Sequence, residues 1–477
     1  MTSQVLTLFL GKIFGALAGI ALVRYLGAEM QGVYSYILSI IFLLSFITDF
    51  GLQSLLVREI KISGSGSPKF FGNALMLQVF QILVSGALIA AYSMTFEKNP
   101  AVKLPLLYAS FAMTLMYLSN PFTAALSSHE KMHLSGLAGG LASILNAIFI
   151  FISISLKFTL PQIILMLGAS NALSALVSGF LCVRYAVKPD FTFDAGILKK
   201  MIIMSLPFAA MGLFNYMYEK VNVLILFSMK GAVEAGYYGG AAKVIEILNA
   251  FVVAIMAPVY PRLSVIINTE SKEKAVRVIN LSVKYLAFAA APCALFVSAL
   301  SSDWTNLLLG AKFQHSAPAL ALLIWTIFLM CMHIIPGYAL NSARLTKLVT
   351  LVYGINIVLN LALNFAFTPS YGYLATSSAS VACNAFAFIT IIYFTDKNIG
   401  KTLIPKYFLK IFTSLIPACL IIFLLKENVN YIILSALSAL TFMASAFLLR
   451  YFDGDDAALF VKIVSGIAKF LPFKKSV

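Results

Sequence analysis

Long apolar stretches run through almost the whole chain, and they restrict its fold more than any other feature. A membrane-spanning helix needs about 20 apolar residues, and its backbone polar groups are bonded within the segment. We identify fourteen such stretches among the 477 residues. The predicted spans are residues 3–23, 33–57, 70–93, 103–125, 134–156, 161–183, 201–228, 236–261, 278–301, 315–341, 346–367, 371–394, 407–425 and 431–450.

The composition agrees with a protein that lies largely within a bilayer. Hydrophobic residues form 61% of the chain and charged residues only 11%, whereas about 25% of the residues of a soluble domain are charged. The predicted fold class is therefore an all-α polytopic membrane protein with about fourteen transmembrane helices.

The basic residues predict how the spans are oriented. An even number of spans puts both termini on one side, and the connections on that side carry 23 Lys and Arg residues against 7 on the other. Lys and Arg accumulate in cytoplasmic loops, so we expect both termini in the cytoplasm. The same rule explains the net charge of +16 without a nucleic-acid partner.

The segment after the last predicted span indicates an amphipathic helix. Between residues 451 and 477, apolar residues recur at helical spacing and lysines occupy the rest of the surface. Such a helix lies in the headgroup region of an anionic leaflet. A frayed polar tail is the alternative.

The chain also contains a weak internal repeat. At an offset of 204 residues the matching pairs are Gly27 and Gly231, Ala28 and Ala232, Gly32 and Gly236, Tyr34 and Tyr238, and Arg58 and Arg262. At an offset of 214 they are Leu126 and Leu340, Ser128 and Ser342, Leu134 and Leu348, and Asn146 and Asn360. Six spans separate the copies, so the halves should be related by an axis along the membrane normal. We expect two six-helix lobes followed by two further helices.

Several charged residues lie inside the predicted spans, where each costs several kcal/mol unless it meets a partner or a wet cavity. They include Lys12, Asp49, Glu219, Lys220, Lys243 and Glu246. Spans 201–228 and 236–261 are antiparallel and joined by a short loop, so their four charges should meet at similar depth. One interpretation is mutual ion pairing for structural reasons, with Lys12 paired to a carboxylate such as that of Asp49.

The other interpretation is that an excess of cations lines a central cavity and holds an anionic head group. Arg and Lys bind phosphate oxygens by charge-assisted hydrogen bonds, so a pyrophosphate is the natural fit. The candidate substrate-binding residues are Lys12, Arg24, Arg58, Lys220, Lys243 and Arg262. The candidate carriers of a coupling ion, or ion-pair partners, are Asp49, Glu219 and Glu246.

The sequence predicts neither a catalytic site nor a metal site. Residues 129–133 read HEKMH, which matches the HExxH pattern of zinc proteases. The other histidines belong to a distant helix, so a third zinc ligand is lacking, and a short polar loop explains the motif. Without a P-loop or a Ser/His/Asp set, we predict a transporter with no cofactor, coupled to a proton or sodium gradient.

Several motifs occur in a fixed order along the chain. The first half contains RYLGAEMQGVYSY and DFGLQSLLVREI, and the second contains SLPF, AGYYGGAAKVIEIL, APVYPRLS, LLLGAKFQHSAPAL and GYLATSSASV. Over about residues 1–395 the chain resembles the bacterial polysaccharide flippases of the MOP exporter superfamily. These are relatives of Wzx-type O-antigen flippases, of lipid II flippases and, more distantly, of multidrug MATE transporters.

The resemblance implies two six-helix lobes around a V-shaped cavity that works by alternating access. By position, Lys12, Arg24 and Arg58 look like the cavity cations of lipid II flippases. The chain differs from many O-antigen flippases by two additional helices, and Glu219 and Lys220 in the seventh span argue against transferring a family coupling-ion site. The predicted domains are a first lobe (1–185), a cytoplasmic linker (186–200), a second lobe (201–395), two extra helices (396–450) and a cytoplasmic tail (451–477).

The resemblance implies flipping of an undecaprenyl-pyrophosphate-linked oligosaccharide repeat unit across the bacterial plasma (inner) membrane. The partners would be this lipid-linked oligosaccharide and the bilayer. The sequence leaves open whether a polysaccharide polymerase or chain-length regulator also binds. A MATE-like multidrug or cation antiporter and a lipid II flippase are alternatives. An antiporter of cationic drugs should favour an acidic cavity, and a membrane polymerase or ligase should carry a large outer loop, whereas the outer connections here are short.

Overall fold

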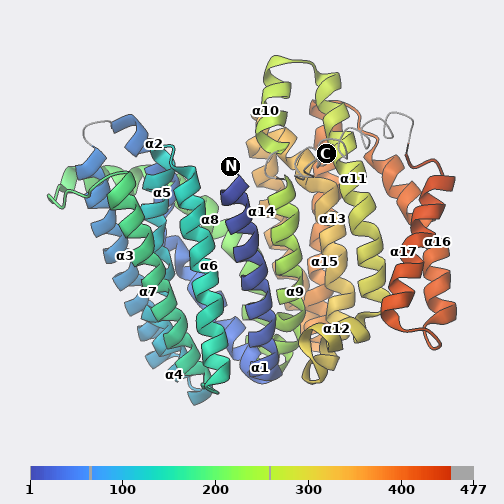
Figure 1. Cartoon of the computed structure of the whole chain (residues 1–477), viewed down its shortest axis with the longest axis horizontal. Helices are drawn as coiled ribbons and strands as arrows, with labels where there is room; N and C mark the ends of the chain where they lie inside the picture. Colours follow the sequence, from blue (N-terminus) through green and yellow to red (C-terminus); the bar gives the residue numbers. More distant parts are fainter. Residues whose placement is uncertain (1, 64–66, 257–258, 453–477) are drawn as a thin grey trace, which may run out of the picture. The chain divides into compact units, whose positions relative to one another are not determined.

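The computed structural model describes residues 2–63, 67–256 and 259–452. Within these ranges the chain is almost entirely helical and contains no β-strand (Figure 1). The elements are α1 (Thr2–Thr48), α2 (Leu52–Ser63), α3 (Ser67–Thr95), α4 (Pro100–Ala112), η2 (Thr114–Ser119), α5 (Asn120–Ser128), α6 (Met132–Ser155), α7 (Leu160–Tyr185), α8 (Ala195–Lys230), α9 (Ala232–Met256), α10 (Val259–Thr269), α11 (Lys272–Ala299), α12 (Ser301–Leu309), η3 (Ala311–Ser316), α13 (Ala317–Ser342), α14 (Thr346–Tyr371), α15 (Tyr373–Asn398), α16 (Ile404–Leu425) and α17 (Tyr431–Leu448).

In the described part of the chain, eleven segments are long and apolar enough to cross a membrane. The first of them, Gly11–Lys61, takes in two predicted spans. The seventh and eighth predicted spans correspond to α8 and α9, which are not among the eleven. The predicted all-α membrane fold class is therefore confirmed, whereas the count of fourteen helices stays a prediction.

The helices form two compact units. The first unit consists of Met1–Ile247, Thr305–Ala319 and Gly354–Cys383, and the second of Leu248–Trp304, Leu320–Tyr353 and Asn384–Val477. In the first unit α1 packs against α6 and α8, and one apolar cluster extends from α1 into α4 and α7. In the second unit α16 and α17 form a hairpin beside α11. The predicted domain boundaries, which rest on the sequence repeat, stay a prediction.

Short polar connections with strong capping residues separate the helices. Asn99 accepts a hydrogen bond from the backbone N–H of Ala101 at the start of α4, where Pro100 is the first helical residue. Thr159 and Gln162 form a reciprocal capping box at the start of α7. Asp194 caps α8 by accepting from Gly196 and Ile197. Each cap satisfies N–H groups that the first helical turn leaves unpaired.

The predicted repeat reappears as a repeat of local conformation. Gly27 interrupts α1 with φ 70° and ψ 175°, and Gly231, its counterpart 204 residues later, precedes α9 with φ 83° and ψ −172°. A side chain makes this backbone conformation costly, so glycine is favoured at both positions. Both copies therefore break the chain in the same way just before the next helix begins.

The second offset is reproduced by one turn that occurs twice. Glu130 follows α5 with φ 60°, and Arg344, 214 residues later, follows α13 with φ 61°. The first turn contains backbone hydrogen bonds from 129 to 125, 130 to 127, 131 to 126 and 134 to 131, and the second contains the same four bonds shifted by 214 residues. The repeat thus extends to the hydrogen bonding of the loops.

The two copies also touch each other through a reciprocal pair of glycines. A Cβ atom built on Gly32 would lie 2.7 Å from the carbonyl carbon of Ala232, and one built on Gly236 would lie 2.6 Å from that of Ala28. Both distances are well below ordinary carbon contacts of about 3.5–4.0 Å. Glycine is therefore required where α1 and α9 cross. Each glycine faces the alanine that precedes the matching glycine of the other copy by four residues.

Candidate functional site

Lys220 of α8 and two residues of α9, Lys243 and Glu246, form a charged cluster in the first unit. Lys243 Nζ lies 3.3 Å from Glu246 Oε1, one turn further along α9. The charge of Lys220 on α8 also acts on Glu246. The ion pair of Lys243 thus lies within its own helix, and the expected meeting of the charges of α8 and α9 at similar depth stays a prediction.

Residues of α1 support both lysines. The stem of Lys243 lies over Gly19, since a Cβ atom on that glycine would come within 2.8 Å of the lysine Cε. Lys220 Nζ lies 4.9 Å from the centre of the Phe42 ring. A cation over a ring face is attracted by the ring quadrupole. The small residue and the aromatic ring on α1 therefore help to fix where the two ammonium groups lie.

Arg24 has a different environment from the two lysines. Its Nε donates to the carbonyl oxygen of Leu308 at 2.7 Å, and its guanidinium also donates to that of Leu307. Both carbonyls belong to the last turn of α12, where helix carbonyls lack intrahelical partners and the helix dipole favours a cation. Arg24 thus caps a helix that is distant in sequence.

The remaining predicted residues are dispersed. Arg58 on α2 is exposed and pairs with the neighbouring Glu59 at 3.0 Å. Asp49, which follows α1, accepts a hydrogen bond from Asn120 at 3.1 Å. Lys12 is exposed on α1, and the expected Lys12–Asp49 pair is absent from the ion pairs of the described residues.

Three further predictions concern residues outside the first unit or outside the described part of the chain. Arg262 is exposed on α10, in the second unit. The side chain of Glu219 and residues 453–477 of the expected amphipathic tail lie outside the described residues. Their roles stay predictions.

A buried network of uncharged side chains lies in the first unit and was not predicted. Asn222 of α8 donates to Tyr238 of α9 at 3.2 Å and to Ser380 of α15 at 3.1 Å, and it accepts from Asn364 of α14 at 3.1 Å. Further bonds join Asn364 with Asn360 and Thr368, and Thr368 with Thr376. The network ties parts of four helices together without any charge.

The HEKMH loop holds its residues by local contacts. Glu130 accepts a hydrogen bond from Lys61 at 2.8 Å, which holds the pKa of that carboxyl below its usual range. His129 bonds through Nδ1 to the carbonyl oxygen of Ala125 at 3.0 Å. These contacts match those of a solvated turn between α5 and α6.

The family of the chain follows from a direct match. The family model described as "Polysaccharide biosynthesis protein" matches residues 1–267, which is more than half of the 477 residues. The chain belongs to the polysaccharide biosynthesis protein family.

The chain is also similar in sequence to a named relative and in fold to two solved structures. It is 23% identical over 373 residues to a Shigella flexneri protein named as an O-antigen transporter, covering 75% of this chain and 87% of the relative. Its fold is similar to that of the lipid II flippase MurJ in an inward closed conformation, with a TM-score of 0.78 and 16% identity over 97% of this chain and 100% of the other. An inward-facing multidrug resistance MATE transporter of the MOP superfamily gives a TM-score of 0.66 at 15% identity over 83% of this chain and 98% of the other.

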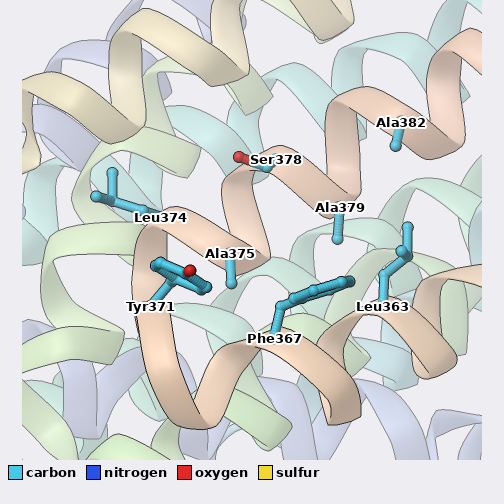
Figure 2. Close-up of a pocket in the computed structure, with 8 residues that line it drawn as sticks. All are labelled: Leu363, Phe367, Tyr371, Leu374, Ala375, Ser378, Ala379 and Ala382. Carbon is cyan, nitrogen blue, oxygen red and sulfur yellow. The ribbon is translucent and has the colours of Figure 1, made fainter.

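The polysaccharide biosynthesis protein also has an apolar pocket, away from the charged cluster in sequence. A cavity of about 340 Å³ is lined by Leu363, Phe367, Tyr371, Leu374, Ala375, Ser378, Ala379 and Ala382. Figure 2 shows these side chains on α14 and α15. None of the predicted charged residues lines it, so its lining suits hydrocarbon and offers no charged partner to a phosphate.

In the second unit, a further cation of the polysaccharide biosynthesis protein was missed from the sequence. Lys284 of α11 is only 1% exposed. Its Nζ lies 5.4 Å from the ring centre of Tyr407, 5.7 Å from that of Tyr451 and 5.9 Å from that of Phe452. The aromatic cage joins α11 to α16 and to the residues that follow α17. Lys284 lies inside the predicted span 278–301, so the rule that an intramembrane charge needs a partner applies to it. Its partner rings could not be found by spacing, because they are more than 100 residues away in sequence.

Proposed function

We propose that this protein flips a polyprenyl-pyrophosphate-linked oligosaccharide from the cytoplasmic to the outer leaflet of a bacterial plasma membrane. The observation that carries the proposal is that Lys243 Nζ lies 3.3 Å from Glu246 and that Lys220 Nζ lies 4.9 Å from the Phe42 ring centre, in helices that belong to a polysaccharide biosynthesis protein. Two lysine ammonium groups suit a pyrophosphate, which offers several oxygens to such donors. The similarity to a protein named as an O-antigen transporter supports a surface polysaccharide as the product.

In this proposal Lys243 exchanges partners when cargo arrives. The pyrophosphate takes the place of Glu246 beside Lys243, and Lys220 leaves the Phe42 ring to reach the same group. Glu246 is then released to bind a coupling proton or sodium ion. Lys12, Arg24, Arg58 and Arg262 would serve as further cations along the route, and Asp49 and Glu219 as further carboxylates.

The proposal covers topology and partners as well. Both termini lie in the cytoplasm, since the connections on their side carry most of the Lys and Arg residues. The protein acts as a transporter and not as an enzyme, without nucleic acid. A polysaccharide polymerase or chain-length regulator would act on the product after flipping.

A second candidate is a lipid II flippase, which is favoured by the similarity to MurJ over 97% of this chain. A multidrug antiporter is a third, since a MATE transporter shares the fold. The fold is common to all three, so the cargo must distinguish them.

The decisive experiment is mass spectrometry of polyprenyl-linked saccharides from a strain that lacks the gene. Accumulation of a complete repeat unit on undecaprenyl pyrophosphate, with loss of the surface polymer, is the expected result. Accumulation of lipid II would assign the second candidate. Unchanged lipid-linked sugars together with altered drug susceptibility would overturn flipping.

Complementation of that strain tests the lysines. The double variant K220Q/K243Q should restore little export while reaching wild-type amounts in the membrane. Lys98 lies exposed between α3 and α4, so K98Q is the matched control and should restore export fully. Full export by K220Q/K243Q would remove the cluster from the mechanism.

A further inference from the structure

The connection between α7 and α8 is fastened to the start of α3. Asp190 donates its backbone N–H to the carbonyl oxygen of Pro68 at 3.0 Å. Asn73 donates to the carbonyl oxygen of Thr192 at 2.8 Å and accepts from the N–H of Asp194 at 2.9 Å. The connection therefore runs along α3 instead of extending freely into water.

An ion pair completes the attachment and links it to α8. Lys69 Nζ lies 2.8 Å from Asp194 Oδ2, and the other carboxylate oxygen of Asp194 caps α8. The lysine hydrogen bond holds the pKa of Asp194 below its usual range. The start of α8 is thereby held beside the start of α3.

The residues that make these contacts alternate with two exposed phenylalanines. Asp190, Thr192 and Asp194 provide the bonds to α3, whereas Phe191 and Phe193 are 58% and 67% exposed. Two neighbouring phenyl rings in water are unfavourable. Their exposure on a segment held in place indicates an apolar environment outside the protein.

The surroundings of the two rings are those of a membrane interface. Tyr185, at the end of α7, is 53% exposed, and the guanidinium of Arg184 lies 5.9 Å from its ring centre. The exposed Lys188, Lys199 and Lys200 lie close by in sequence. Aromatic rings at the end of a span, beside basic residues, match the headgroup region of an anionic leaflet.

We propose that Phe191 and Phe193 insert into the interfacial region of an anionic bilayer on the side of the two termini. Lys188, Lys199 and Lys200 bind the lipid phosphates, and the connection anchors the start of α8 to both α3 and the membrane. The anchor does not depend on the cargo of the transporter, because it lies outside the charged cluster of α8 and α9.

Tryptophan fluorescence in the full-length protein tests the insertion. Phe191→Trp and Phe193→Trp are placed in a W304F/W325F background and reconstituted into vesicles that contain phosphatidylglycerol and brominated lipid. Both tryptophans should emit at short wavelength and be quenched several-fold more than Glu130→Trp, which reports on an exposed loop. Quenching equal to that of Glu130→Trp would overturn the proposal.

Thermal unfolding of otherwise unchanged protein gives a second test. Adding phosphatidylglycerol to phosphatidylcholine vesicles should raise the melting temperature of wild type and of F191L/F193L, but not of F191S/F193S. An equal rise in all three would contradict insertion. If the short-wavelength emission of Phe191→Trp depended on the ratio of protein to lipid, the rings would be assigned to a contact with a second copy of the chain. That result would also contradict insertion into the bilayer.

Discussion

The reciprocal glycine contact between α1 and α9 gives a quantitative prediction. Changing Gly236 to Ala places a Cβ atom 2.6 Å from the carbonyl carbon of Ala28 and still closer to its oxygen, so the helices must separate by roughly 1.5 Å or more to reach ordinary contact. Inserting a methyl group into a packed site costs about 1–3 kcal/mol. Alanine recovers about 0.5–1 kcal/mol of that in a helix. The net effect should be destabilisation by about 1 kcal/mol.

The assay is thermal unfolding of the purified protein in one detergent. Gly139 on α6 is the matched control, because a Cβ atom there meets nothing within 4 Å. G139A should unfold at or above the wild-type temperature, and G236A about 1 °C below it. The double variant G32A/G236A should cost less than the sum of the two single variants, because both perturb one contact.

Equal stability of G236A and G139A would show that α1 and α9 are not closely packed at Gly32 and Gly236. It would refute the reciprocal contact between the two copies of the repeat.

Three further predictions concern single contacts. Asn364→Leu leaves the buried Oδ1 of Asn222 without its donor and should lower the free energy of unfolding by about 1–3 kcal/mol, measured by chemical denaturation; an unchanged midpoint would contradict it. The pKa of Asp194 is lowered by Lys69, so the Lys69–Asp194 link stabilises above the ordinary Asp pKa of about 3.9 and is lost as pH falls through the lowered value. Amide exchange around residue 194, corrected for its intrinsic pH dependence, should rise on acidification, whereas D194N should show the faster exchange already at pH 7. Arg24→Gln should reduce thermal stability because it uncaps α12; a loss of export at unchanged stability would instead place Arg24 in the transport route.

Local sequence patterns predicted much of the fold. Apolar stretches of sufficient length gave the membrane class, and the weak repeat anticipated the paired breaks at Gly27 and Gly231 and the paired turns at Glu130 and Arg344. These features depend on residues within a few positions of each other. The ion pair of Lys243 with Glu246 was also accessible, because residues three positions apart are neighbours on the surface of one helix.

Contacts between distant segments were not accessible in this way. Arg24 reaches carbonyls 283 and 284 residues away, which no local spacing reveals; its role as a cavity cation stays a prediction. The network around Asn222 could not be predicted from charges within the spans, because all of its side chains are uncharged. A signal was present, since Asn356, Asn360 and Asn364 recur every fourth residue and share one face of α14.

The hydrogen bonds around Asn222 also limit how the protein can work in time. Opening one of them where water cannot replace the lost partner costs about 1–3 kcal/mol, and every 1.4 kcal/mol added to a barrier slows a step about tenfold. A step that pulled several of these bonds apart together would therefore be slowed by several factors of ten. The joined segments of α8, α9, α14 and α15 therefore travel as one block, and the rearrangements of turnover fall on contacts outside it.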